Sequence, residues 1–474
     1  MPHRSSLCLM ATMVRERQIS PVDLVDAHLR HIEKHNPKIN AFVRVLADEA
    51  RKAAKQAETA VMRGEALGLL HGVPVTVKDS FDIAGLPTLC GSKFRLDHRA
   101  SEDATAVARL RAAGAIILGK TNCPEFLYNY ETDNYITGRT NNPWDLTRTA
   151  GGSSGGESAA IASYCSAGGI GSDGGGSIRI PAHFCGIAGL KPTPGRVSAA
   201  GHFPVISHPG GLLGVGGPMA RSANDVRLLF AVLAGYDTQD PFSAPVPIQV
   251  PKANGIRIGV MEQFYKVPVR PEIRDVVQKA ARTLEQIGFR VEPFTPKGLE
   301  RAPNLWWFFF GQLPAPQIKK IIEDREQDAH WTGTEFVTQA LKEAAPTATN
   351  VLENLAERDS MRAAMLRQME RVPVIIGPPC GVPAFHHRER RWPGNGKSIG
   401  LFEAMMPATP FNLLGFPAAV IPFGMTSENI PVGVQIIGRP WEEELVLEVA
   451  VKLEDARGRF PGPRDIRNNA CGRF

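Results

Sequence analysis

The sequence predicts an α/β protein built on a covered sheet. Short apolar stretches alternate with segments whose apolar residues recur at helical spacing. Two glycine-rich clusters, at 151–156 and 174–176, lie next to predicted helices and strands. A chain of 474 residues with 43% apolar content is also long enough to bury a sizeable core. Alternation of strand and helix is typical of a fold whose sheet is buried beneath helices.

The first extended helix is expected to begin after Ser20. Serine is a favoured N-cap and Pro21 suits the first helical position, and apolar residues at helical spacing continue to about Asn36-Pro37. The short apolar stretches that follow end in glycine or in charge, which is typical of buried strands. By this reasoning we expect helices over 47–63 and 104–113 and strands over 72–79 and 115–119.

Two serine-bearing glycine clusters stand in the segment from Gly151 to Arg179. Ser153 and Ser154 are in the first cluster, and Ser177, in the second, follows Ser153 by 24 residues. The residues between them predict a helix and then a short strand over 169–172. Because a strand can return most of the length of such a helix, the spacing permits both clusters to meet at one edge of the sheet.

We expect one domain over residues 1–474. Its predicted parts are N-terminal helices over about 5–63, a core over about 65–235, a largely helical insertion over about 265–370 and a return to the sheet over about 372–456. The returning part is expected to contain strands over 372–376, 418–422 and 432–437 and a final helix over 442–456.

Composition excludes several classes of protein. The net charge of +6 is small for this length and the basic residues are scattered, so a nucleic-acid partner is not expected. No apolar run is long enough to cross a bilayer, and no membrane partner is expected. The seven cysteines form no C-x-x-C pair, which indicates reduced thiols and a cytoplasmic protein. Neither a metal motif nor a cofactor motif is present.

The candidate chemistry combines a lysine with the two serine clusters. A serine hydroxyl such as that of Ser177 needs a base, and Lys78 ends an apolar strand where burial would lower its pKa. A neutral Lys78 would take the proton of Ser177 through Ser153. The amides of the second cluster would stabilise an oxyanion, and Asp173 would hold that loop in shape. The expected oxyanion-hole residues are Gly174, Gly175 and Gly176.

Each of these features has a simpler interpretation when it is taken alone. A lysine at a strand end is more often solvated than catalytic. A glycine-serine cluster is as often a flexible loop as a site, and Asp173 is more often structural than chemical. The order of the three features along the chain is what favours acyl transfer.

The chain resembles the amidase signature family. The segment from Gly151 to Thr193 matches the namesake motif of that family, which is long and specific. The resemblance covers about residues 15–235 and 372–456. Further matches are HGVPVTVKD (71–79), GKTNCPEF (119–126), NNPWD (141–145), GPMARS (217–222), NLLGFPAAVIP (412–422) and PVGVQIIGRPWEEE (431–444).

The resemblance implies an α/β/α sandwich around a large, mixed, twisted β-sheet. It also implies hydrolysis of an amide to a carboxylate and ammonia or an amine. In that reaction Ser177 is the acyl-enzyme nucleophile, Lys78 is the general base, and Ser153 follows a cis peptide bond and relays protons. By the same resemblance Ser154 and Arg179 support the serine loops.

Two positions depart from the common pattern of the family. Gly174 stands where threonine or isoleucine is frequent, and Cys123 stands where methionine is frequent. Neither belongs to the implied triad of Lys78, Ser153 and Ser177, so the expected chemistry is unchanged.

Other classes of function fit the sequence less well. Gly151 to Gly155 also satisfies the G-x-S-x-G nucleophile elbow of α/β-hydrolases, but that fold requires a histidine late in the chain, and the last ones are His386 and His387. The intact triad residues argue against a non-catalytic relative. A glutaminase subunit of a tRNA-dependent amidotransferase stays open as an alternative.

The substrate class is a separate expectation. The aromatic run from Leu305 to Phe310 suggests a pocket for bulky or aryl amides, with esters and carbamates as further substrates. An apolar helix packed on the core is the more common explanation for most of these side chains. The partner expected is thus a small-molecule amide, and a homodimer is left open. The expected pocket residues are Tyr130, Trp306 and Trp307.

Overall fold

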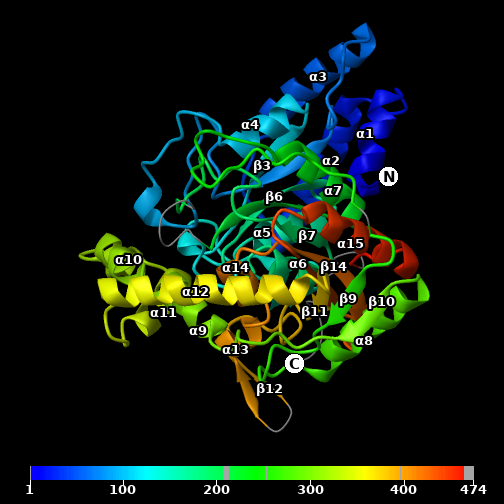
Figure 1. Ribbon diagram of the computed structural model, residues 1–474. Helices are drawn as coiled ribbons and strands as arrows, with labels where there is room; N and C mark the ends of the chain where they lie inside the picture. The colour runs from blue at the N-terminus through cyan, green and yellow to red at the C-terminus, as the bar shows by residue number, and fades with distance from the viewer. Residues whose placement is uncertain (1, 206–212, 252, 395–396, 464–474) are drawn as a thin grey trace, which may run out of the picture.

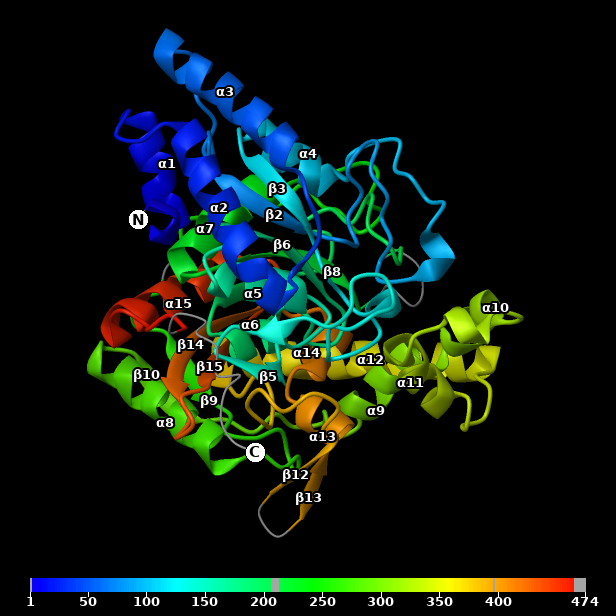
Figure 2. The same ribbon diagram turned by 180° about the vertical axis from the view of Figure 1, so that it is seen from behind.

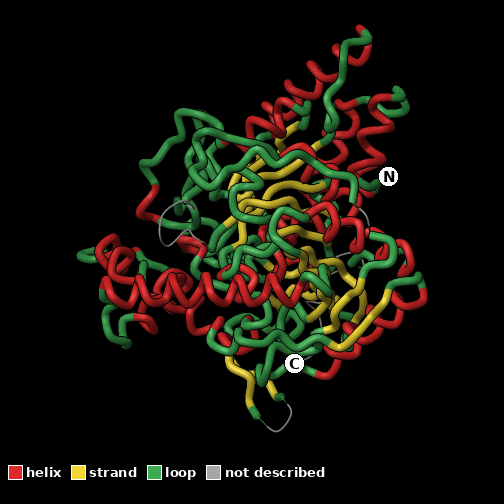
Figure 3. The backbone as a smooth tube through the Cα atoms, in the orientation of Figure 1, coloured by secondary structure: helices red, strands yellow, loops and turns green. Residues whose placement is uncertain are grey.

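The computed structural model describes residues 2–205, 213–251, 253–394 and 397–463. A mixed sheet runs through the molecule (Figures 1 and 3). It has eleven strands in the order β1-β3-β2-β6-β8-β7-β14-β15-β11-β9-β10. This confirms the predicted α/β class with a large mixed sheet. The strands are β1 (Phe42–Val45), β2 (Pro74–Lys78), β3 (Ile116–Thr121), β6 (Gly168–Asp173), β7 (Ala188–Lys191), β8 (Val215–Ala220), β9 (Arg257–Val260), β10 (Arg290–Pro293), β11 (Val374–Gly377), β14 (Ala418–Met425) and β15 (Pro431–Gly438).

Helices cover the sheet on both faces, as the two opposite views show (Figures 1 and 2). One layer consists of α1 (Leu7–Arg15), α4 (Thr105–Ala112), α7 (Ala223–Leu233), α8 (Pro271–Gln286) and α15 (Glu443–Arg457). The other contains α2 (Pro21–Ile39), α3 (Ala47–Arg63), α5 (Gly155–Ala162) and α6 (Arg179–Cys185).

A group of helices from the second half of the chain lies beside the sheet. Helices α10, α11 and α12 extend to one side of it (Figure 1). The group comprises α9 (Ala302–Trp307), a π-helical turn η5 (Phe308–Gln312), α10 (Ala315–Ile322), α11 (Trp331–Ala340), α12 (Ala348–Met369), α13 (Leu401–Met405) and α14 (Thr409–Leu413). Two hairpins, β4 (Asn141–Asn142) with β5 (Asp145–Thr149) and β12 (Arg391–Pro393) with β13 (Ser398–Gly400), complete the strands.

Local sequence accounts for the main elements. The Ser20 hydroxyl accepts from Val22 N–H and caps α2, as expected. The predicted end near Asn36-Pro37 is wrong, because α2 accommodates Pro37 in its last turn and continues to Ile39. Asn40, with φ 55°, then closes the helix through its N–H to the carbonyl of Asn36.

The range 265–370, predicted to be largely helical, contains α8 to α12 and also β10. This strand pairs in parallel with β9 at the edge of the sheet, and its residues are half-buried or exposed. Such a short edge strand has no buried apolar run, so the sequence pattern did not reveal it. Among the described residues, no helix combines the length and the apolar character that crossing a bilayer requires.

Alternation along β2 sends its side chains to opposite faces of the sheet. Val75 and Val77 join the large apolar cluster that includes residues of α7 and α15. Thr76 and Lys78 face the other way, toward α5, where Thr76 donates to Glu157. The strand therefore carries a lysine into a polar interior, at its carboxyl end.

Candidate active site

Lys78 is the last residue of β2 and is fully buried. Its Nζ lies 2.7 Å from Ser153 Oγ and 3.0 Å from Ser154 Oγ. Ser172 Oγ, on the neighbouring strand β6, is also 3.0 Å away. Burial lowers the pKa of Lys78 to about 8, which makes its neutral amine accessible at mildly alkaline pH.

The first glycine cluster turns the chain sharply before α5. The peptide bond between Gly152 and Ser153 is cis, as the resemblance implies. A side chain at position 152 would place its Cβ 2.5 Å from the carbonyl oxygen of Asn129, so only glycine fits. Ser154 N–H donates to the carbonyl of Ser177 at 3.1 Å and joins the two clusters. The predicted meeting of the clusters therefore occurs.

The link from Lys78 to Ser153 is formed, whereas the next link is not. Over the residues that the structure describes, no hydrogen bond connects the hydroxyls of Ser153 and Ser177. Ser177 is 6% exposed, so its hydroxyl sits in a nearly closed site. Catalytic hydrogen bonds are often long or poorly aligned before substrate binds.

The side chain of Asp173 binds backbone N–H groups in and next to the second glycine cluster. Its carboxylate accepts from the N–H of Gly176 at 2.7 Å and from that of Ile178 at 3.0 Å. It also pairs with the guanidinium of Arg179 at 3.0 Å. Burial alone would raise the pKa of Asp173, but Arg179 and these hydrogen bonds hold it well below its ordinary value. Asp173 and Arg179 therefore contact the loop that they are expected to support.

The predicted oxyanion hole is changed in one position. The Gly176 N–H donates to Asp173, so it is not a free donor, contrary to the expectation. Within the described part of the chain, the amides of Gly174, Gly175 and Ser177 donate no hydrogen bond. These three N–H groups are therefore the candidate donors for an oxyanion.

Two residues far along the chain, Asn412 and Gln435, also bind Asp173 or Arg179, and they were not predicted from the sequence. Arg179 donates to Gln435 Oε1 at 2.6 Å and also contacts Asn412. Asn412 Nδ2 donates to the carbonyl of Asp173 at 3.1 Å. Both amides stand in matched family motifs, NLLGFP and PVGVQ, and this was the available signal.

Two further polar residues of the site were missed in the signature segment itself. Ser172 contacts Lys78 as described above. Glu157 is buried and accepts from the hydroxyls of Thr76 at 2.6 Å and Thr121 at 2.7 Å. Burial raises the pKa of Glu157 to about 7. An acidic residue inside an alanine-rich, apolar helix is the signal that sequence reasoning passed over.

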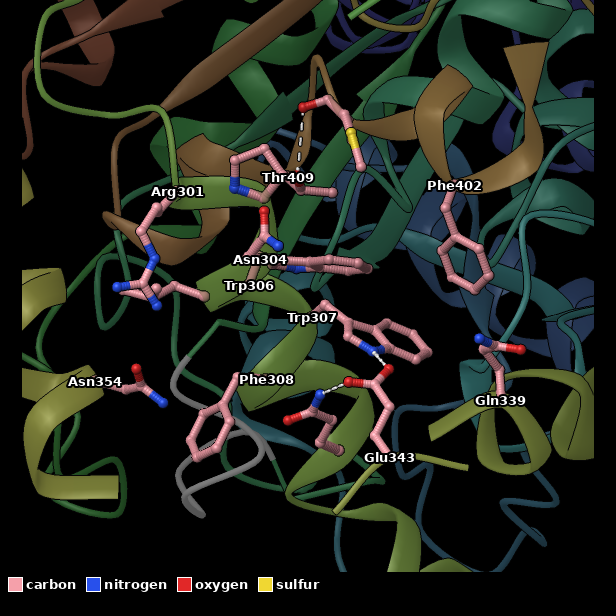
Figure 4. Close-up of a pocket in the computed structure, with 14 residues that line it drawn as sticks. Arg301, Asn304, Trp306, Trp307, Phe308, Gln339, Glu343, Asn354, Phe402 and Thr409 are labelled. Carbon is pink, nitrogen blue, oxygen red and sulfur yellow. Dashed lines mark hydrogen bonds between the residues drawn. The ribbon is translucent and has the colours of Figure 1, made fainter. Parts of the chain in front are cut away.

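The three expected pocket residues take different positions. Tyr130 donates its hydroxyl to the carbonyl of Gly175 at 3.0 Å, and Trp306 donates its indole N–H to the carbonyl of Gly174 at 2.8 Å. Trp307 instead donates its indole N–H to the carboxylate of Glu343 at 2.8 Å (Figure 4). Most of the run 305–310 is buried, as the simpler interpretation predicts; its buried members are Leu305, Trp306, Phe308 and Phe309.

A cavity of about 370 Å³ opens beside α9 (Figure 4). Trp306, Trp307 and Phe402 give it aromatic walls, and Gln339 and Glu343 give it polar groups. Ser177 is not among the residues that line this cavity, but Trp306 both lines it and donates to the carbonyl of Gly174 in the second glycine cluster. Within the described ranges, no group of three or more His, Cys, Asp or Glu side chains could hold a metal ion.

This combination of a buried lysine, two serine loops and a mixed sheet is typical of a hydrolase of the amidase type. The profile of the family described as Amidase matches residues 23–447. The chain belongs to this family and is a hydrolase of the class that cleaves carbon–nitrogen bonds in linear amides. The implied fold and enzyme class are thus confirmed.

Relatives of known name support this assignment. The indoleacetamide hydrolase of Bradyrhizobium diazoefficiens is 34% identical over 457 residues, which cover 94% of this chain and 86% of that protein. A glutamyl-tRNA(Gln) amidotransferase subunit of Sulfurihydrogenibium is 33% identical over 494 residues, which cover 97% of this chain and 99% of that protein.

Solved structures agree in fold. A bacterial aryl acylamidase of the amidase signature family superposes with a TM-score of 0.86 at 28% identity, covering 95% of this chain and 96% of that chain. The 6-aminohexanoate cyclic dimer hydrolase complexed with substrate gives 0.84 at 30% identity, covering 95% and 97%.

Proposed function

We propose that this chain hydrolyses carboxylic amides through an acyl-enzyme on Ser177, with Lys78 as general base acting through Ser153. The observation that carries the proposal is the fully buried Lys78 Nζ, 2.7 Å from Ser153 Oγ. The Ser153 loop is in turn joined to Ser177 by the backbone bond from Ser154. A desolvated amine with a lowered pKa is suited to accept a proton near neutral pH.

The reaction takes place in two halves. Ser177 Oγ attacks the amide carbonyl while its proton passes to Ser153 and the Ser153 proton passes to neutral Lys78. The tetrahedral oxyanion receives hydrogen bonds from the free amides around Gly175. The C–N bond then breaks, and the relay returns the proton to the departing ammonia or amine. Water attacks the ester by the same route, releasing the carboxylate and restoring Ser177. The hydrogen bond between Ser153 and Ser177 is expected to form when substrate binds.

The proposed substrates are aryl or otherwise bulky apolar amides. The aromatic cavity beside Trp306 is the support, because an aryl group placed there would stack on indole and phenyl faces. The names of two relatives, an indoleacetamide hydrolase and an aryl acylamidase, point to the same class. Esters and carbamates present the same carbonyl with other leaving groups and are proposed as secondary substrates.

A glutaminase subunit of a tRNA-dependent amidotransferase is the second candidate. Seven of the relatives compared are named as the same glutamyl-tRNA(Gln) amidotransferase component, at 29–34% identity. Such a protein would copurify with partner chains in fixed ratio and would release ammonia from glutamine. A free amidase would instead cleave simple amides as the isolated chain, so the two candidates separate in one assay.

The cellular location and the domain organisation of the protein are further proposals. We propose a cytoplasmic enzyme, which fits the free thiols of Cys8, Cys90, Cys123, Cys165, Cys185 and Cys380. We also propose that the chain forms one domain, with a homodimer open as its oligomeric state.

The decisive test is to trap the acyl-enzyme. The purified protein is incubated with a panel of amides, anilides, esters and carbamates, and intact-mass spectrometry follows the chain. We expect a mass increase equal to the acyl group, mapped to the peptide that contains Ser177. Ser177→Ala should abolish the adduct and lower kcat by about 10⁴-fold or more.

Ser163→Ala is the matched control, because this hydroxyl donates to the backbone carbonyls of Ala159 and Ala160 at the end of α5 and contacts none of Lys78, Ser153 and Ser177. It should keep both the adduct and the turnover. Undiminished hydrolysis by Ser177→Ala, or an adduct on another residue, would overturn the proposed nucleophile.

A further inference from the structure

We infer that Tyr130 and Trp306 are positioning residues that aim the backbone amides of the oxyanion loop, defined as residues 174–177. The inference rests on the proposed function, since it concerns the stabilisation of its oxyanion. Neither residue belongs to the signature segment 151–193. Each donates to one of two consecutive carbonyls, Tyr130 to Gly175 at 3.0 Å and Trp306 to Gly174 at 2.8 Å.

Peptide geometry converts these two bonds into control of the amides. In a planar trans peptide the C=O of one residue and the N–H of the next point in opposite directions. Trp306 holds the carbonyl of Gly174, so the N–H of Gly175 must point away from the indole. In the next peptide Tyr130 holds the carbonyl of Gly175 while Asp173 takes the N–H of Gly176 at 2.7 Å. The first plane therefore presents a free N–H, that of Gly175. The second plane has no free N–H, but because it is fixed at both ends it holds the loop rigid between the free amides of Gly175 and Ser177.

The loop needs such support because it is made of glycine. Three consecutive glycines have more backbone freedom than any other three residues. Gly176 adopts a positive φ of 113°, which other residues rarely do. An oxyanion donor is effective only when its direction is set before reaction. A Cβ on Gly175 would overlap Trp306 Cζ2, and one on Gly174 would lie 3.1 Å from Phe310 Cε2. Aromatic rings thus occupy the space that side chains of the loop would need.

The indole of Trp306 is itself held in place. It stacks on Phe310 with ring centroids 4.7 Å apart, and Phe310 stacks on Tyr128 at 4.9 Å. Tyr128 also donates its hydroxyl to the carbonyl of Phe310. Trp306 is only 3% exposed, whereas the adjacent Trp307 turns its N–H to Glu343 at the cavity (Figure 4). Trp306 therefore contacts the oxyanion loop, whereas its neighbour Trp307 contacts Glu343 at the cavity.

The test uses Tyr130→Phe and Trp306→Phe, which keep a ring and remove the donor. We expect kcat on an aryl amide to fall about 10-fold for each variant and KM to change less than about 3-fold, because the bonds act on the transition state. An aryl boronic acid, which forms a tetrahedral adduct with the serine oxygen, should lose affinity by a factor similar to the kcat loss. The affinity of the carboxylate product should stay within about 3-fold.

Trp144→Phe is the matched control. Its indole also donates to a backbone carbonyl, that of Cys185, at 2.8 Å, but outside the site. It should leave kcat and boronic-acid affinity unchanged. Tyr130→Phe, which removes one oxygen atom, carries the test alone if Trp306→Phe does not fold.

Two outcomes would overturn the inference. One is an unchanged kcat with a raised KM, which would make both residues plain pocket walls. The other is an equal loss of affinity for boronic acid and product. Failure of the proposed function looks different, because then the wild-type chain turns over no amide or Ser177→Ala stays active.

Discussion

The signature region, defined as Lys78 together with segment 151–193, and the helical region 302–369 differ in the kinds of side chain that they bury. The first is polar and buried: Lys78, Asp173 and Arg179 are each at most 1% exposed, and all three are hydrogen-bonded or ion-paired. The second buries apolar side chains: Trp306, Phe308 and Phe309 in α9 and η5, and Met361, Met365 and Met369 in the long helix α12. Under the proposed function, the first region performs the chemistry and the second selects the substrate. The two regions meet where Trp306 reaches Gly174.

This separation has an energetic reason. A buried polar network is stable only when every member is satisfied, so a single loss leaves an unpaired group in a medium of low dielectric. Aromatic walls tolerate exchange of volume more easily. Substitutions in the signature region should therefore lower kcat on every substrate. Substitutions in the helical region should instead change the relative kcat/KM for different substrates.

The largest effect among the variants considered next is expected for Lys78→Ala. Loss of the base should lower kcat on amides by about 10³-fold. Esters should suffer less, because an alkoxide or phenolate leaves without the proton that an amine requires. The measurement is kcat for a matched amide and ester with the same acyl group, in wild type and variant. Equal losses on both substrates would show that Lys78 does not protonate the leaving group.

The residues that the candidate site brings together could be predicted from the sequence because they lie in short, specific motifs. Lys78, Ser153 and Ser177 fall within HGVPVTVKD and the signature segment. Local patterns also predicted the bounds of α3, and those of β2 to within two residues. The long-range contacts could not be predicted in this way. Arg179 and Gln435 are 256 positions apart, and Trp306 and Gly174 are 132 apart. No local pattern encodes which distant donor meets a given carbonyl.

The second prediction concerns pH. Burial lowers the pKa of Lys78 to about 8, and only the uncharged amine accepts a proton. As pH falls below this value the lysine becomes protonated, so kcat/KM should drop about 10-fold per pH unit and reach its plateau above it. The measurement is a pH–rate profile of the free enzyme with a neutral amide. A maximum near pH 5 would contradict a lysine base.

The smallest effect is expected for Trp307→Ala, which acts only through the cavity. Removing this wall should lower the preference for aryl over short aliphatic amides by about 10-fold, chiefly through KM, since a lost apolar contact weakens binding of the ring. The ratio of kcat/KM for the two substrates is the measurement, and the aliphatic amide serves as the internal control. An unchanged ratio would remove the cavity from the substrate site. A fall in kcat on both substrates would instead mean that Trp307 shares the positioning role assigned to Trp306, and the division between the two regions would then lie one residue further along α9.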